Sequence, residues 1–202
     1  MLETLINKAQ LRHVFILMLI LMSPALFSGL MGDDLFHYAL LNGAANFPQT
    51  DDISLFHLFS FINDDPVRRA HLQDMSIMSW WISPTFEWNF WRPLAELTHY
   101  IDYVWLKDYA WLMHIHSLVY FVIIVSLVYQ LCLLIFQEHK LALLITALYA
   151  LSATHGMTVA WLSNRNALLA LLFALISLIT FIKSQQQSNK SHLSSVGDAL
   201  VT

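Results

Sequence analysis

Charged side chains are scarce in this sequence. Asp, Glu, Lys and Arg make up 12% of its 202 residues, whereas soluble domains average about 25%. Hydrophobic residues account for 57% of the chain and the mean hydropathy is +0.57. Because long apolar runs accompany the shortage of charge, the composition predicts a membrane protein. The basic residues are scattered, which argues against a nucleic-acid partner.

Cysteine and several common motifs are also nearly or wholly lacking. Cys132 is the single cysteine and lies within an apolar run. It cannot form an intrachain disulfide, and we expect it to be a small buried hydrophobic residue. The sequence contains no glycine-rich phosphate loop, no CxxC pair and no internal repeat. These absences leave the apolar runs as the main organising feature.

Four apolar stretches predict membrane-spanning helices: residues 14–31, 115–136, 141–162 and 167–182. A cleaved signal peptide is the alternative for the first stretch, but its length and the poor cleavage site favour an uncleaved anchor. Pro24 is expected to disturb the first helix locally. Polar residues from Thr154 to Thr158 predict a bend or an unwound turn in the third.

The segments between these stretches indicate the orientation. Residues 32–114 form a long connector that holds eleven acidic and four basic residues. Lys8, Arg12, Lys140, Lys183 and Lys190 all fall on the opposite side, which the positive-inside rule assigns to the cytoplasm, while the turn at residues 163–166 with Arg165 faces outward. We therefore expect an all-α polytopic membrane protein with about four transmembrane helices and a large outer loop containing interfacial helices. Residues 1–182 would form one module, and residues 183–202 a disordered cytoplasmic tail.

Asp33 and Asp34 follow the first apolar stretch directly. One interpretation is structural: acids suit the first turn of a short amphipathic helix, and Gly43 would end it. The other is chemical, because a carboxylate close to lipid has a raised pKa and can act as a general base. The position after the first span brings the two interpretations to equal weight. Together with His37 the pair also permits a divalent metal site, the lesser alternative.

Three further residues are candidates for binding an anionic substrate. Arg92 precedes Pro93 at the expected start of a helix and could meet a phosphate there, or snorkel to the lipid surface. His155 lies in the bent part of the third stretch, where an ionisable residue is a functional candidate. Arg165, just beyond it, could serve an anionic head group. Either of the last two could instead cap a helix or snorkel.

The acidic pair, the Arg92–Leu94 segment and residues 159–169 (VAWLSNRNALL) together resemble a known family. It comprises the transmembrane tetratricopeptide-repeat O-mannosyltransferases and their bacterial relatives, in the GT-C superfamily of glycosyltransferases. The resemblance covers about residues 14–182. It implies a bacterial plasma membrane protein that transfers a sugar from a polyprenyl-phosphate donor on the outer face.

The resemblance also implies roles for the candidate residues. Asp33 and Asp34 correspond to the catalytic acids, with Asp33 favoured as the general base. Arg92, His155 and Arg165 become candidates for contacts with the donor phosphate or the acceptor. No metal or other cofactor is required, because the leaving group carries a single phosphate that arginines can balance.

Departures from the family pattern leave other functions open. The family often has a His-Pro pair and a Glu before residues 159–169 and an acid after the arginine, where this chain has Ser152, Ala153, Met157 and Ala167. The relatives also have more spans. The chain would then be a fragment of a longer transferase, and the alternative function is a non-catalytic membrane subunit or degenerate relative that acts with a partner. A metal- or ion-handling protein that uses Asp33, Asp34, His37 and His155 is a third.

Overall fold

The computed structural model describes residues 2–42, 58–62, 65–76 and 78–201, and helices make up 76% of the chain. The elements are, in chain order, α1 (Leu2–Met22), the 3₁₀ turn η1 (Ser23–Phe27), α2 (Asp33–Asn42), β1 (Ser60–Ile62), α3 (Pro66–Asp74), β2 (Trp88–Asn89), α4 (Pro93–Tyr100), the π-helical segment η3 (Ile101–Trp105), α5 (Ala110–Phe136), α6 (His139–Ala150), α7 (His155–Ala160), the 3₁₀ turn η4 (Leu162–Asn164) and α8 (Arg165–Val201).

Three helices are long and apolar enough to cross a membrane: Gln10–Phe27, Ala110–Phe136 and Leu162–Ser188. They contain most or all of the first, second and fourth predicted stretches. In the first, the regular α-helix ends at Met22 and continues as the 3₁₀ turn η1, with Pro24 in its first positions. Proline lacks an amide hydrogen, so it cannot continue the i→i−4 bonding of α1.

The third predicted stretch, residues 141–162, forms two helices, α6 and α7, in place of one continuous helix. The twelve residues of α6 extend about 18 Å, which is shorter than the roughly 30 Å hydrocarbon layer. The break falls where the Ser152 and Thr154 hydroxyls lie 2.8 Å apart and Thr154 donates its backbone N–H to Ser152 Oγ. Such local bonds compete with helical hydrogen bonding.

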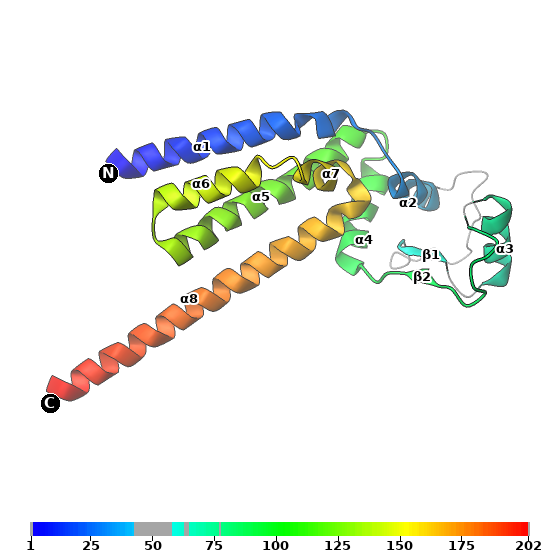
Figure 1. Ribbon diagram of the computed structural model, residues 1–202. Helices are drawn as coiled ribbons and strands as arrows, with labels where there is room; N and C mark the ends of the chain where they lie inside the picture. Colours follow the sequence, from blue (N-terminus) through cyan, green and yellow to red (C-terminus); the bar gives the residue numbers. More distant parts are fainter. Residues whose placement is uncertain (1, 43–57, 63–64, 77, 202) are drawn as a thin grey trace.

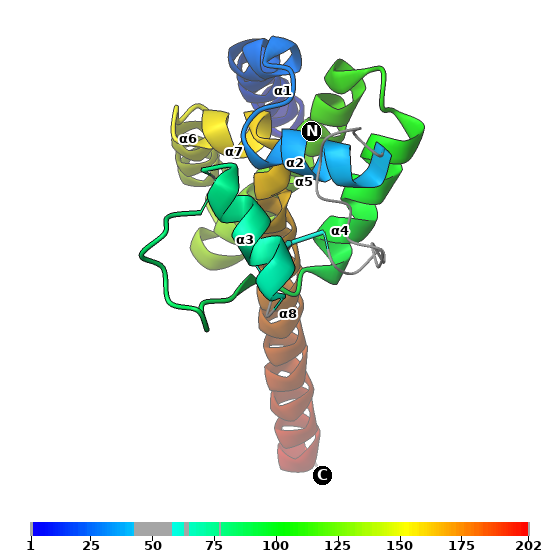
Figure 2. The same cartoon turned by 90° about the vertical axis from the view of Figure 1, so that its right-hand side faces the viewer.

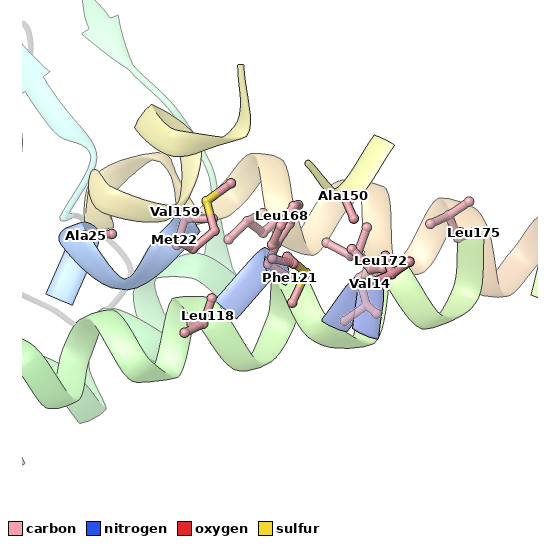
Figure 3. Close-up of a cluster of buried hydrophobic side chains, with 13 residues drawn as sticks. Val14, Met22, Ala25, Leu118, Phe121, Ala150, Val159, Leu168, Leu172 and Leu175 are labelled. Carbon is pink, nitrogen blue, oxygen red and sulfur yellow. The ribbon is translucent and has the colours of Figure 1, made fainter. Parts of the chain in front are cut away.

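The helices pack around one main apolar cluster. In Figure 1, α1, α5 and α6 run side by side, while α8 diverges from them along its length and ends far from all three. The cluster draws its side chains mainly from α1, α5 and the first half of α8, and Figure 3 shows how they interdigitate. Its members recur at helical spacing and include Val14, Met18, Met22, Leu118, Phe121, Leu168, Leu172 and Leu175.

Beyond this cluster, residues from the 32–114 segment gather at the end of the bundle where α5 and α8 begin. The predicted helices that follow Gly32 and Arg92 are present as α2 and α4, and Figure 2 shows α3 in front of them. Gly43, the expected end of α2, lies outside the described residues. Strands β1 and β2 pair antiparallel, with Ser60 opposite Asn89 and Ile62 opposite Trp88.

The carboxy-terminal end differs from expectation, because α8 continues as a helix to Val201 where we expected disorder from Lys183. No proline occurs between residues 165 and 201, so no residue there lacks the amide hydrogen that helical bonding needs.

Candidate functional site

The short junction between α7 and α8 organises the polar residues of this protein. Trp161 is extended, η4 turns the chain, and α8 begins at Arg165. Three side chains of the junction, Ser163, Arg165 and Asn166, bind three different parts of the 32–114 segment. The site is therefore assembled from residues more than forty positions apart in sequence.

Asp34 lies at the first of these contacts and is fully buried, with 0% of its surface exposed. Its Oδ1 accepts hydrogen bonds from the Ser163 backbone N–H (2.6 Å), Ser163 Oγ (2.5 Å) and the Tyr103 hydroxyl (3.5 Å). Its Oδ2 accepts from the backbone N–H groups of Leu162 and Met31, both at 3.3 Å. The bond to Met31 is a local contact at the start of α2, the bond from Tyr103 attaches α2 to η3, and the other three attach it to the junction.

Asp33, its neighbour, is only half-buried, and among the described residues no hydrogen-bond donor is found for its carboxylate. Burial raises the pKa of Asp33 above its ordinary value, the Asp34 charge raises it further, and the positive charge of Arg92 opposes both. Asp33 is thus the member of the pair that retains a partly exposed carboxylate, within electrostatic range of Arg92.

Arg92 is held by aromatic rings and by α8. Its guanidinium lies over Phe59, 4.8 Å from the ring centroid, and over Phe90 at 4.4 Å. Arg92 Nη1 also donates to Asn166 Oδ1 at 3.4 Å. Partial burial lowers the pKa of Arg92, and Asp33 opposes this effect. Stacking on aromatic rings restricts the conformations of an arginine and leaves its N–H groups available to bind an anion.

A groove of about 320 Å³ opens beside Arg92, between α4 and α8. Arg92 and Asn166 supply its polar groups, and the rest of the lining is apolar. Three residues of α8 share the face that lines it, because they follow Asn166 by three, four and seven positions. The lining consists of Arg92, Pro93, Leu94, Ala95, Asn166, Leu169, Ala170 and Phe173.

Arg165 occupies a buried ion pair. Its Nη2 lies 2.5 Å from Asp102 Oδ2, and both side chains are 0% exposed. Nη2 also donates to the Met113 carbonyl at 3.0 Å, and Nε donates to Ser117 Oγ at 3.1 Å. The expected contact of Arg165 with a donor phosphate needs an exposed guanidinium, which this arrangement does not offer. Arg165 instead joins the start of α8 to η3 and α5.

The ion pair continues outward through two side chains of α5. His116 Nδ1 lies 2.8 Å from Asp102 Oδ1, and His116 Nε2 lies 2.9 Å from the Tyr120 hydroxyl. With Nδ1 donating to the carboxylate, Nε2 accepts from the tyrosine. The chain from Arg165 to Tyr120 therefore connects α8, η3 and two turns of α5.

His155 is placed apart from these residues. It begins α7, and its ring centroid lies 4.4 Å from that of Tyr149 and 5.1 Å from that of Phe121. These ring contacts come from α6 and α5. The structure thus brings Asp33, Asp34, Arg92 and Arg165 to one end of the bundle and leaves His155 against an aromatic pair.

Two buried histidines complete the cluster. His37 Nδ1 lies 3.2 Å from Ser163 Oγ, and burial lowers the pKa of His37 to about 3. His99 stacks on Tyr103 at 5.5 Å, and burial lowers its pKa well below the ordinary value, with Arg165 adding to the effect. Both imidazoles are therefore neutral near pH 7. In the part of the chain that the structure describes, no group of three or more His, Cys, Asp or Glu side chains could hold a metal ion.

Sequence reasoning missed several residues of this cluster: Ser163, Asn166, Asp102, Tyr103 and His116. The partners of the first two lie 74 to 129 residues away, so no spacing in the sequence reveals the contacts. The His116–Tyr120 pair was readable in principle, because the two residues are one helical turn apart.

No protein-family model, curated protein or solved structure matches this chain. The chemistry must therefore be argued from the cluster itself. It combines an accessible carboxylate with a raised pKa, an ordered guanidinium within its electrostatic reach, and an apolar groove that begins at that guanidinium.

Proposed function

We propose that this protein is a membrane glycosyltransferase of the GT-C type, or part of one. It would transfer a sugar from a polyprenyl-phosphate donor to an acceptor hydroxyl on the outer face of a bacterial plasma membrane. The observation that carries the proposal is an apolar groove between α4 and α8 that begins at Arg92, with the Asp33 carboxylate within electrostatic range of that arginine. An anionic head group on an apolar chain fits that combination.

The reaction would use the two charges in succession. Asp33 accepts the proton of the acceptor hydroxyl as the hydroxyl oxygen bonds to the anomeric carbon. The bond from that carbon to the phosphate oxygen breaks, and polyprenyl phosphate leaves with the electron pair. Arg92 balances the negative charge that develops on the phosphate. The apolar lining of Leu169, Ala170 and Phe173 would receive the first units of the lipid chain.

A four-crossing topology accompanies the proposal. Helix α5 runs away from the end that holds Asp33 and Arg92, and α6 with α7 returns the chain to it, where α8 begins (Figure 1). Although α6 is short, the pair α6–α7 would supply the remaining crossing. The amino and carboxy termini would then be cytoplasmic, in agreement with the lysine and arginine distribution.

The direct test is a transfer assay on purified protein in lipid nanodiscs with a polyprenyl-phosphate sugar. We expect Asp33→Asn to lower the rate by roughly 10²-fold or more, as removal of a general base does. Asp74→Asn is the matched control, because Asp74 is an exposed acid on α3. Full activity of Asp33→Asn in a preparation whose wild type transfers sugar would rule out the mechanism.

A non-catalytic membrane subunit is the second candidate, and one observation favours it. Helix α8 diverges from the other helices and carries exposed apolar side chains such as Phe173 and Phe181 (Figure 1). Such a helix can pack against a partner as well as against lipid. Co-purification of a stoichiometric membrane partner, together with no donor binding by the isolated chain, would favour this function.

A further inference from the structure

The two adjacent aspartates differ in how many hydrogen bonds each carboxylate already accepts. On Asp34, Oδ1 accepts three hydrogen bonds and Oδ2 accepts two. A carboxylate offers about four lone-pair sites in all, so its accepting capacity is already used. The side chain has no exposed surface. Neither an acceptor hydroxyl nor a phosphate can reach it without breaking this set of bonds.

The hydrogen-bond donors to Asp34 show which segment of the chain it binds. Two of them are backbone N–H groups of η4, and a third is the hydroxyl of Ser163 in the same turn. These bonds join α2 to a segment 128 residues away in sequence. Asp34 therefore determines how α2 is rotated and seated against the start of α8.

The rotation of α2 in turn sets the direction of Asp33. Successive residues of an α-helix point about 100° apart, so when Asp34 faces η4, Asp33 faces sideways, within electrostatic reach of Arg92. Arg92 is itself bonded to Asn166, two residues beyond η4. Contacts with the same short stretch, residues 162–166, therefore hold both α2, which carries Asp33, and Arg92.

We propose that Asp34 is a positioning residue, which acts through Ser163 and the η4 amides to fix the direction of Asp33 at the start of α2. The inference rests on the proposed function for the part of Asp33 in catalysis. The two acids then have different roles: Asp33 is the general base, and Asp34 orients the helix that carries it. Ser163 becomes a second positioning residue, because its hydroxyl donates to Asp34 and lies within hydrogen-bond distance of His37.

The first measurement is a distance distribution by pulsed electron–electron spin resonance. With Cys132 replaced by alanine, spin labels are attached at the exposed positions Leu35 of α2 and Leu171 of α8 in the full chain in nanodiscs. We expect Asp34→Asn and Ser163→Ala to broaden or shift the distribution. Asp33→Asn and Ser163→Thr, which keeps the hydroxyl, should match the wild type. Should Asp34→Asn not fold, Ser163→Ala decides alone.

The second measurement is the pH profile of sugar transfer. Asp34→Asn and Ser163→Ala should lower the rate by roughly 10- to 100-fold, as a small misplacement of a reacting group does. The acid limb of the profile should persist, because Asp33 is still the base. Distributions as narrow and as centred as the wild type in both variants, or loss of the acid limb in Asp34→Asn, would overturn the inference. If the wild type transfers no sugar, the proposed function fails, and the distance measurement still decides whether Asp34 seats α2.

Discussion

At the scale of single residues, burial separates side chains that are chemically alike. Asp33 and Asp34 are identical and adjacent, yet one keeps an accessible carboxylate and the other has both oxygens bonded. Arg92 and Arg165 divide in the same way. The first lies at a groove, and the second is sealed in an ion pair with Asp102. Burial therefore leaves Asp33 and Arg92 with accessible charged groups and encloses those of Asp34 and Arg165.

The pKa of Asp33 provides a test at this scale. Because the positive charge of Arg92 favours the ionised carboxylate, Arg92→Ala should raise the pKa of Asp33 further. Arg92→Lys should leave it closer to the wild type. The pKa is measured from the pH dependence of the carboxyl infrared band that Asp33→Asn removes. An Asp33 that titrates at the same pH in Arg92→Ala and in the wild type would show that the two groups are not coupled.

The same shift has a consequence for activity. The proposed base must be ionised, so the transfer rate should increase with pH through the raised pKa of Asp33. Loss of Arg92 should move that rise to higher pH, in the direction of the infrared titration.

At the scale of elements, the start of α8 is the point at which several segments are tied together. Asp34 attaches α2 to η4, and Arg165 attaches α8 to η3 and α5. The π-helical segment η3 contributes to both, because Asp102 binds Arg165 and its neighbour Tyr103 donates to Asp34. Segments of π-helix frequently occur at functional sites, since the extra residue per turn redirects side chains.

The buried ion pair predicts a large stability effect. Arg165→Met leaves the Asp102 carboxylate buried without its guanidinium and should lower the free energy of unfolding by about 3–5 kcal/mol. Lys183→Met, an exposed change on the same helix, should cost no more than about 0.5 kcal/mol. Denaturant unfolding in detergent measures both. The double variant Arg165→Met/Asp102→Leu should recover part of the loss, because no unpaired charge remains. Equal stability of the two single variants would contradict the predicted cost of the unpaired charge.

At the scale of the whole molecule, the path of the chain determines at which end of the helical bundle each connecting segment lies. Helix α5 and the pair α6–α7 run in opposite directions, so the start of α8 returns to the end that carries α2 and α4 (Figure 1). Figure 2, viewed from that end, shows α3 and α4 in front and α8 receding behind them. The polar cluster and the groove thus share one end of the molecule.

Topology can be tested by cysteine labelling in intact cells. In a Cys132→Ala background, we expect a cysteine at Ser83 to react with a membrane-impermeant maleimide from outside. Cysteines at Glu138 and Gln185 should react only after permeabilisation. If α6 and α7 do not together cross the membrane, positions 138 and 185 will lie on opposite sides, and one of them will react in intact cells.

Several features of this protein follow from the order of its residues alone. The shortage of charge and the long apolar runs predict membrane-compatible helices, because apolar length is a local property. Pro24 marks the end of regular α1, and Pro93 marks the start of α4, because proline acts on its own backbone. The short helix from Asp33 follows from the acids in its first turn.

Only the tertiary structure decided which polar residues meet. Ser163 reaches Asp34 across 129 positions, and Asn166 reaches Arg92 across 74, so neither contact has a signature in spacing. The fold also buries Arg165 and places His155 against Tyr149, although the sequence predicted that both could bind an anionic substrate. Local sequence specifies helices through short-range bonds, whereas the protonation and reach of a side chain depend on what distant segments pack around it.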